Sequence, residues 1–151
     1  MIQNYACDNI LKIKDYTRKQ YEQKDILEWI HTTDYMNYMI KSNKIQEFDN
    51  AASFSSIEHS GLGRYGDPLD PNGDIKAVHQ VHCMIKPGGL FFLGLPAVST
   101  DKGFIQFNAH RFYGNKRLEK LFIGWELLED TRKYSSSEHA VFVLKKKLCP
   151  E

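Results

Sequence analysis

The stretch IKPGGLFFLGLP, which runs from Ile85 to Pro96, decides the fold class of this chain. Proline cannot continue a helix, and the two glycines after it allow the backbone to turn sharply. The apolar run that follows, Gly89 to Leu95, is typical of a strand buried on both faces of a parallel sheet. A turn of this kind, leading directly into a buried strand, indicates an α/β fold.

The residues before this stretch predict a strand and a helix. Small, β-branched and aromatic residues from Ala51 to Ile57 favour a strand. Apolar residues then recur at helical spacing between Ile75 and Ile85, so we expect a helix of about three turns that starts near Asp74. We predict that residues 50–57 and 89–95 form adjacent parallel strands, joined by this helix in a right-handed crossover.

The residues after this stretch predict three more elements. A helix is expected over residues 116–122, with Gly124 at its C-cap, and two closing strands over 125–130 and 140–144. We expect Lys145 to Lys147 to form the solvated end of the last strand.

The composition excludes several classes of protein. A chain of 151 residues with 42% hydrophobic residues can bury one core, so a single domain is expected. A net charge of +1 without blocks of like charge argues against nucleic acid or a membrane as a partner. The three cysteines are odd in number and unclustered, which favours a reducing compartment, and we expect a cytoplasmic protein.

Two further segments carry a family resemblance. They are SIEHSGLGRYGDP (Ser56 to Pro68) and FNAHRFYG (Phe107 to Gly114). With the Lys-Pro-Gly-Gly turn, they make residues 48–144 similar to class I S-adenosylmethionine-dependent methyltransferases, and closest to the methyltransferase-like family called "domain of unknown function 268". The resemblance implies a Rossmann-like α/β fold with sheet order 3-2-1-4-5-7-6, in which residues 48–59 hold the fourth strand. It also implies S-adenosylmethionine as methyl donor and a small-molecule or sugar-like acceptor.

Residues 1–47 match this family only weakly. The resemblance implies that Asp15 binds the cofactor's ribose and that Asp34 lies near its adenine. No glycine precedes Gly61, so the family's first strand and its glycine-rich loop are missing. We therefore expect one partial domain over residues 1–151, a class I fold truncated at the N-terminus, and weak or absent binding of S-adenosylmethionine. A partner chain that supplies the missing half is the alternative.

Glu58 and His59 lie where the predicted strand ends, which is where open α/β sheets bind their ligands. We take His59 as the candidate general base and Glu58 as the residue that orients it. Glu58 could equally cap the following loop, with His59 as a half-buried hydrogen-bonding residue.

Two groups of polar residues could bind the acceptor, and we expect the loop 60–73 to fold against residues 108–113. The first group lies in this loop, where an internal pair between Arg64 and Asp67 or Asp70 is the alternative. The second group follows the fifth strand, where capping of the next helix is the alternative. The candidate acceptor-binding residues are Arg64, Tyr65, Asp67, His110, Arg111 and Tyr113.

A metal site is not expected. His79, His82 and Cys83 share one side of the predicted helix, but no fourth ligand is visible and apolar residues interleave with them. Two hypotheses of function remain open. The chain is either a methyltransferase or a non-catalytic truncated paralogue or partial gene product that acts through protein contacts.

Overall fold

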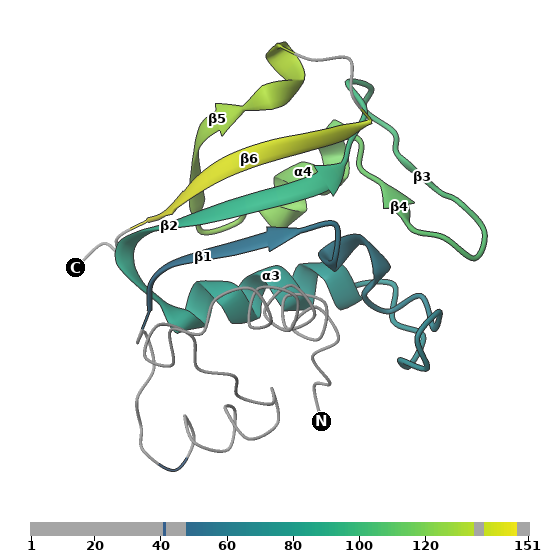
Figure 1. The fold of residues 1–151 in the computed structure, drawn as a ribbon, viewed down its shortest axis with the longest axis horizontal. Helices are drawn as coiled ribbons and strands as arrows, with labels where there is room; N and C mark the ends of the chain where they lie inside the picture. The colour runs from purple at the N-terminus through teal and green to yellow at the C-terminus, as the bar shows by residue number, and fades with distance from the viewer. Residues whose placement is uncertain (1–40, 42–47, 135–137, 148–151) are drawn as a thin grey trace, which may run out of the picture.

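A computed structural model describes residues 41, 48–134 and 138–147 of the chain (Figure 1). The described elements are β1 (Phe48–Phe54), the 3-10 turn η1 (Ile57–His59), α3 (Gly73–Met84), β2 (Ile85–Pro96), β3 (Phe104–Ile105), β4 (Arg111–Phe112), α4 (Asn115–Leu121), β5 (Trp125–Asp130), the 3-10 turn η2 (Thr131–Lys133) and β6 (His139–Lys146).

The main sheet has the order β1-β2-β6-β5. β1 and β2 are parallel, with Ala51 opposite Phe91 and Ser53 opposite Leu93, and α3 connects them. β6 pairs antiparallel with both β2 and β5. The predicted parallel neighbours are therefore confirmed, and the order agrees with the 4-5-7-6 half of the expected sheet.

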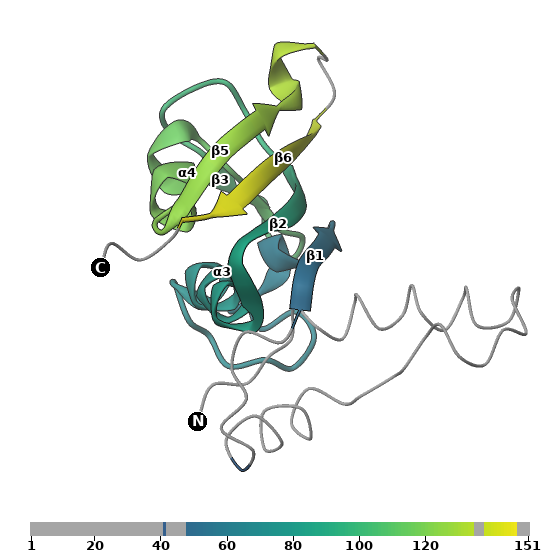
Figure 2. The ribbon, with the colours of Figure 1, turned by 90° about the vertical axis from the view of Figure 1, so that its left-hand side faces the viewer.

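Both described helices lie on the same side of this sheet (Figure 2). Phe91, Leu93 and Leu95 point to that side and are fully buried, while Phe92 on the opposite face is 42% exposed. The prediction that this strand is buried on both faces is therefore wrong at Phe92, although Gly94 and Pro96 on the same face are buried. No described helix covers the second face.

The first strand is shorter than predicted. β1 ends at Phe54, and Ser55 adopts a left-handed backbone with φ 51°. The chain turns there, so Ile57 enters the η1 turn and is fully buried in the core rather than extending the strand. Among the described helices, none is long and apolar enough to cross a membrane.

Lys146 is not solvated as expected, because it is only 4% exposed. Its ammonium group donates to the carbonyl oxygens of His82 at 2.7 Å and Ile85 at 2.8 Å. These carbonyls lie at the end of α3, where helical carbonyls lack intrahelical partners and favour a positive charge. The distant end of β6 thus caps this helix.

We expect Lys146→Met to lower the free energy of unfolding by about 1–3 kcal/mol, because two buried carbonyls lose their donor while the apolar stem is kept. Urea denaturation measures the change. Lys145→Met is the control, because Lys145 lies next to Lys146 in β6 but its side chain is exposed. Equal effects of the two substitutions would contradict the capping role.

Candidate functional site

The chain segment directly after β1 holds a buried carboxylate. Glu58 is fully buried, and its Oε1 accepts a hydrogen bond from the Ser55 hydroxyl at 2.9 Å. The left-handed backbone of Ser55 brings this hydroxyl back over the η1 turn. The other carboxylate oxygen, Oε2, makes no hydrogen bond with the described residues.

His59 lies beside this carboxylate with a defined tautomer. Its Nδ1 lies 2.8 Å from the carbonyl oxygen of Ala109. A carbonyl only accepts hydrogen bonds, so Nδ1 carries the proton and Nε2 of the neutral ring keeps a free lone pair. Nε2 lies 3.8 Å from Glu58 Oε1, and the His59 side chain is 12% exposed. The arrangement therefore gives a neutral imidazole whose accepting nitrogen lies near a buried carboxylate.

The loop after His59 folds against the segment before β4, as predicted. Arg64 donates to the Ala109 carbonyl at 3.2 Å, and its guanidinium lies 5.5 Å from the centre of the Tyr65 ring. The His59 ring makes edge contacts with Tyr65 and with His110, at 5.4 and 5.6 Å between ring centres. One backbone carbonyl thus joins the two segments.

The carboxylates of this loop have partners other than Arg64. Asp67 accepts from the backbone N–H groups of Gly61 at 2.7 Å and Tyr65 at 3.3 Å. Asp70 instead pairs with Lys76 at 2.6 Å, and this bond lowers the pKa of Asp70. Asp67 therefore fixes the loop backbone while Arg64 remains near the surface.

Burial lowers the pKa of His110, and its Nε2 is buried without a hydrogen bond to the described residues. The ring packs against Phe112 with ring centres 4.8 Å apart. The neutral form is therefore the one that the fold favours.

We expect the stability of the protein to fall as the pH drops below about 6.5, the usual pKa of histidine. The unfolded chain then binds more protons than the folded chain, because the folded pKa of His110 lies lower. His82, whose pKa burial and the charge of Lys146 also lower, contributes in the same direction. Melting temperatures between pH 7.5 and 5 measure this.

His110→Phe should show a smaller loss over the same pH range than the wild type. An unchanged pH dependence in this variant would contradict the assignment. His79→Phe, on the exposed side of α3, is the control.

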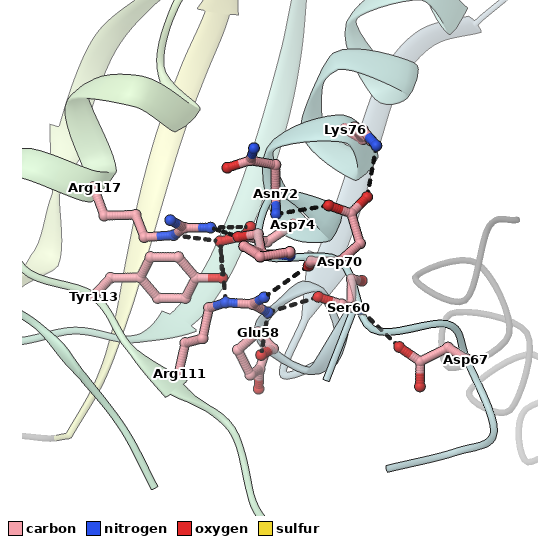
Figure 3. Close-up of polar contacts among 12 residues, drawn as sticks. Glu58, Ser60, Asp67, Asp70, Asn72, Asp74, Lys76, Arg111, Tyr113 and Arg117 are labelled. Carbon is pink, nitrogen blue, oxygen red and sulfur yellow. Dashed lines mark hydrogen bonds and ion pairs between the residues drawn. The ribbon is translucent and has the colours of Figure 1, made fainter. Parts of the chain in front are cut away.

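Arg111 and Tyr113 lie in a buried polar network rather than at the surface (Figure 3). Arg111 donates to the carbonyl oxygens of Glu58 at 3.2 Å and Ser60 at 2.6 Å. The Tyr113 hydroxyl donates to Asp74 Oδ2 at 3.0 Å, and burial, with the nearby charge of Asp74, raises the pKa of Tyr113 well above its usual value. Arg111 therefore holds the loop to β4, whereas Tyr113 holds the first turn of α3.

Asp74 and Arg117 complete this network, and the sequence analysis missed their roles. Asp74 is fully buried in the first turn of α3. It accepts two hydrogen bonds from the Arg117 guanidinium, which raises the pKa of Arg117. An acidic residue in the first turn is common in helices and reveals nothing of a partner 43 positions away.

The remaining candidates are the two residues predicted to bind the cofactor and the residues considered as metal ligands. Asp15 and Asp34 lie outside the described residues, so their proposed cofactor contacts stay predictions. In the described ranges, no group of three or more His, Cys, Asp or Glu residues could hold a metal ion. His82 instead contacts the Gly124 carbonyl through Nε2 at 3.2 Å, with its ring against Trp125.

Solved structures share this fold at low sequence identity. A 1,6-didemethyltoxoflavin-N1-methyltransferase from Burkholderia thailandensis, solved with S-adenosylhomocysteine, is 11% identical with a TM-score of 0.51 over 79% of this chain and 59% of its own. TehB from Haemophilus influenzae is 15% identical with a TM-score of 0.52 over 92% of this chain and 47% of its own. The chain thus spans about half the length of these proteins.

These likenesses show the Rossmann-like α/β fold of class I methyltransferases. No curated protein sequence matches the chain. The family model described as "Caenorhabditis protein of unknown function, DUF268" matches residues 1–149. The chain therefore belongs to the DUF268 family, which is methyltransferase-like in its fold.

Proposed function

We propose that this chain takes part in S-adenosylmethionine-dependent methyl transfer to a small molecule, with His59 as general base. One observation carries the proposal: the Ala109 carbonyl fixes the proton on Nδ1, so Nε2 is the nitrogen that can accept a proton. The buried carboxylate of Glu58 lies 3.8 Å from this nitrogen. The cluster also stands at the carboxyl end of β1, where open α/β sheets bind ligands.

In this proposal Nε2 of His59 takes the proton of an acceptor O–H or N–H group as that group is methylated. Glu58 is a positioning residue that stabilises the imidazolium formed, because opposite charges attract strongly in a buried site. S-adenosylmethionine supplies the methyl group when bound. Asp15 is proposed to bind its ribose, and Asp34 to lie near its adenine. Arg64 and Tyr65, both exposed beside His59, are proposed to contact the acceptor.

A labelled-methyl assay tests the proposal. The purified chain is incubated with methyl-labelled S-adenosylmethionine and a panel of small alcohols, phenols, amines and sugars. Transfer to at least one compound is expected. Absence of label in every product, with the cofactor saturating, would contradict an independent methyltransferase.

We expect the chain of 151 residues to bind S-adenosylmethionine weakly, with a dissociation constant near millimolar or above. The glycine-rich turn of class I methyltransferases lets the backbone approach the cofactor, and no glycine precedes Gly61 here. Each polar cofactor group left unpaired costs about 1–3 kcal/mol, and every 1.4 kcal/mol is about tenfold in affinity. Calorimetric titration measures this constant. A low micromolar value that Asp15→Ala abolishes would show that the expectation is wrong.

The second candidate function is a non-catalytic one, in which the chain acts through contact with a partner protein. Phe54 and Phe92 favour it, because they are 54% and 42% exposed on the sheet face opposite α3 and α4. In this case the chain alone transfers no methyl group, and Phe92→Asp abolishes the association seen by sedimentation. A cytoplasmic location is part of either proposal.

A further inference from the structure

We propose that a hollow between the loop 61–71 and the hairpin of β3 and β4 binds an amphipathic organic anion. The hollow has a volume of about 470 Å3. Small-molecule sites usually measure about 300–1,000 Å3 and combine apolar walls with a few fixed polar groups. Glu58, His59 and His110 do not line this hollow, so it is separate from the cluster at the end of β1.

The walls of the hollow are apolar side chains from two segments. Leu62 and Leu69 come from the loop, and Phe104, Ile105 and Phe112 from the hairpin. Phe104 and Phe112 stack with their ring centres 4.5 Å apart. Leu69 is 82% exposed and Ile105 is 62% exposed, so a flat apolar ligand between them would remove both from water.

The polar end of the hollow carries a net positive charge. Arg111 and Arg117 both line it, and they share the single carboxylate of Asp74, which lies 3.7 Å from Arg111 Nε and bonds to Arg117 (Figure 3). Asp70 also lines the hollow, but Lys76 pairs with its carboxylate. One positive charge therefore remains to attract an anion.

Arg117 has a donor to spare. Its Nε and Nη2 bond to Asp74 and to the Pro71 carbonyl, whereas Nη1 makes no hydrogen bond in the part of the chain that the structure describes. The Arg117 side chain is 30% exposed, so solvent reaches part of it. A carboxylate or sulfonate accepts charge-assisted hydrogen bonds from such a group. The hollow thus fits an aromatic or aliphatic body with one acidic group.

Two dyes with the same aromatic body test the proposal on the full chain. Anilinonaphthalene sulfonate carries the acidic group, and phenylnaphthylamine lacks it. We expect saturable fluorescence enhancement with the sulfonate and binding about tenfold weaker with the neutral dye, since one charge-assisted hydrogen bond is lost. Non-saturable enhancement, or equal affinities for the two dyes, would overturn the proposal.

Two matched variants locate the binding. Ile105→Asp places a carboxylate in the hollow and should weaken sulfonate binding about tenfold. Phe107→Asp makes the same kind of change at the nearby position 107, which is 96% exposed and does not line the hollow, so binding should stay within about twofold. Both positions are exposed, and circular dichroism verifies that both variants fold. The same effect from both variants would place the dye elsewhere and refute the site.

Discussion

Replacing Asp74 by alanine is expected to lower the free energy of unfolding by about 3–5 kcal/mol, which is the usual cost of removing one partner from a buried ion pair. Asp74 is fully buried, and its carboxylate receives the Tyr113 hydroxyl and the Arg117 guanidinium. Without it, a buried hydroxyl loses its acceptor, and the guanidiniums of Arg111 and Arg117 lose the counter-charge that they share. Urea denaturation followed by circular dichroism measures the loss.

Asp49→Ala is the matched control for this substitution. Asp49 also forms an ion pair, in this case with Lys86 at 2.7 Å, but the Asp49 side chain is 80% exposed. Water solvates both charges there, so the unfolding midpoint should move little. If the two substitutions destabilise the protein equally, the Asp74 network does not hold the loop and the helices together.

Replacing His59 by glutamine is expected to lower the rate of methyl transfer about 10²–10⁴-fold, the usual contribution of a general base. Glutamine can still donate to the Ala109 carbonyl, but its amide cannot accept a proton from the acceptor group. The labelled-methyl assay gives the rates. Because the loss concerns proton transfer, it should appear in kcat, with KM for the acceptor changed little.

His79→Gln controls for the loss of an imidazole, because His79 lies exposed on α3. Glu58→Gln should act through His59, so its transfer rate should fall less and its pH profile should shift. A His59→Gln variant that transfers methyl groups as fast as His79→Gln would refute the role of the base. A melting temperature within a few degrees of the wild type shows that the variant is folded.

The two segments that carry the resemblance predicted where the cluster of Glu58 and His59 lies. The hydrogen bonds of the cluster depend on residues far away in the sequence. Glu58 and His59 were expected at the end of the first described strand, and they lie in the η1 turn that follows it. The carbonyl that orients His59 belongs to Ala109, 50 positions away. Every residue has a backbone carbonyl, so the sequence does not reveal which one accepts this hydrogen bond. Arg111 and Tyr113 were predicted to face the acceptor, but both contribute to the buried network around Asp74.

The sequence by itself determined the order of the main-sheet strands and of the two helices among them, because local chemistry dictates it, but it gave no sign of β3 and β4. Pro87 with the two following glycines stops a helix, and apolar spacing separates α3 and α4 from the strands. Only the tertiary structure decided which polar groups meet. Asp74 binds Arg117, and Lys146 caps α3, across chain separations that no periodic pattern encodes. Burial made these pairs necessary, because a charge removed from water is costly unless it has a partner. The fold supplies that partner from a distant part of the chain.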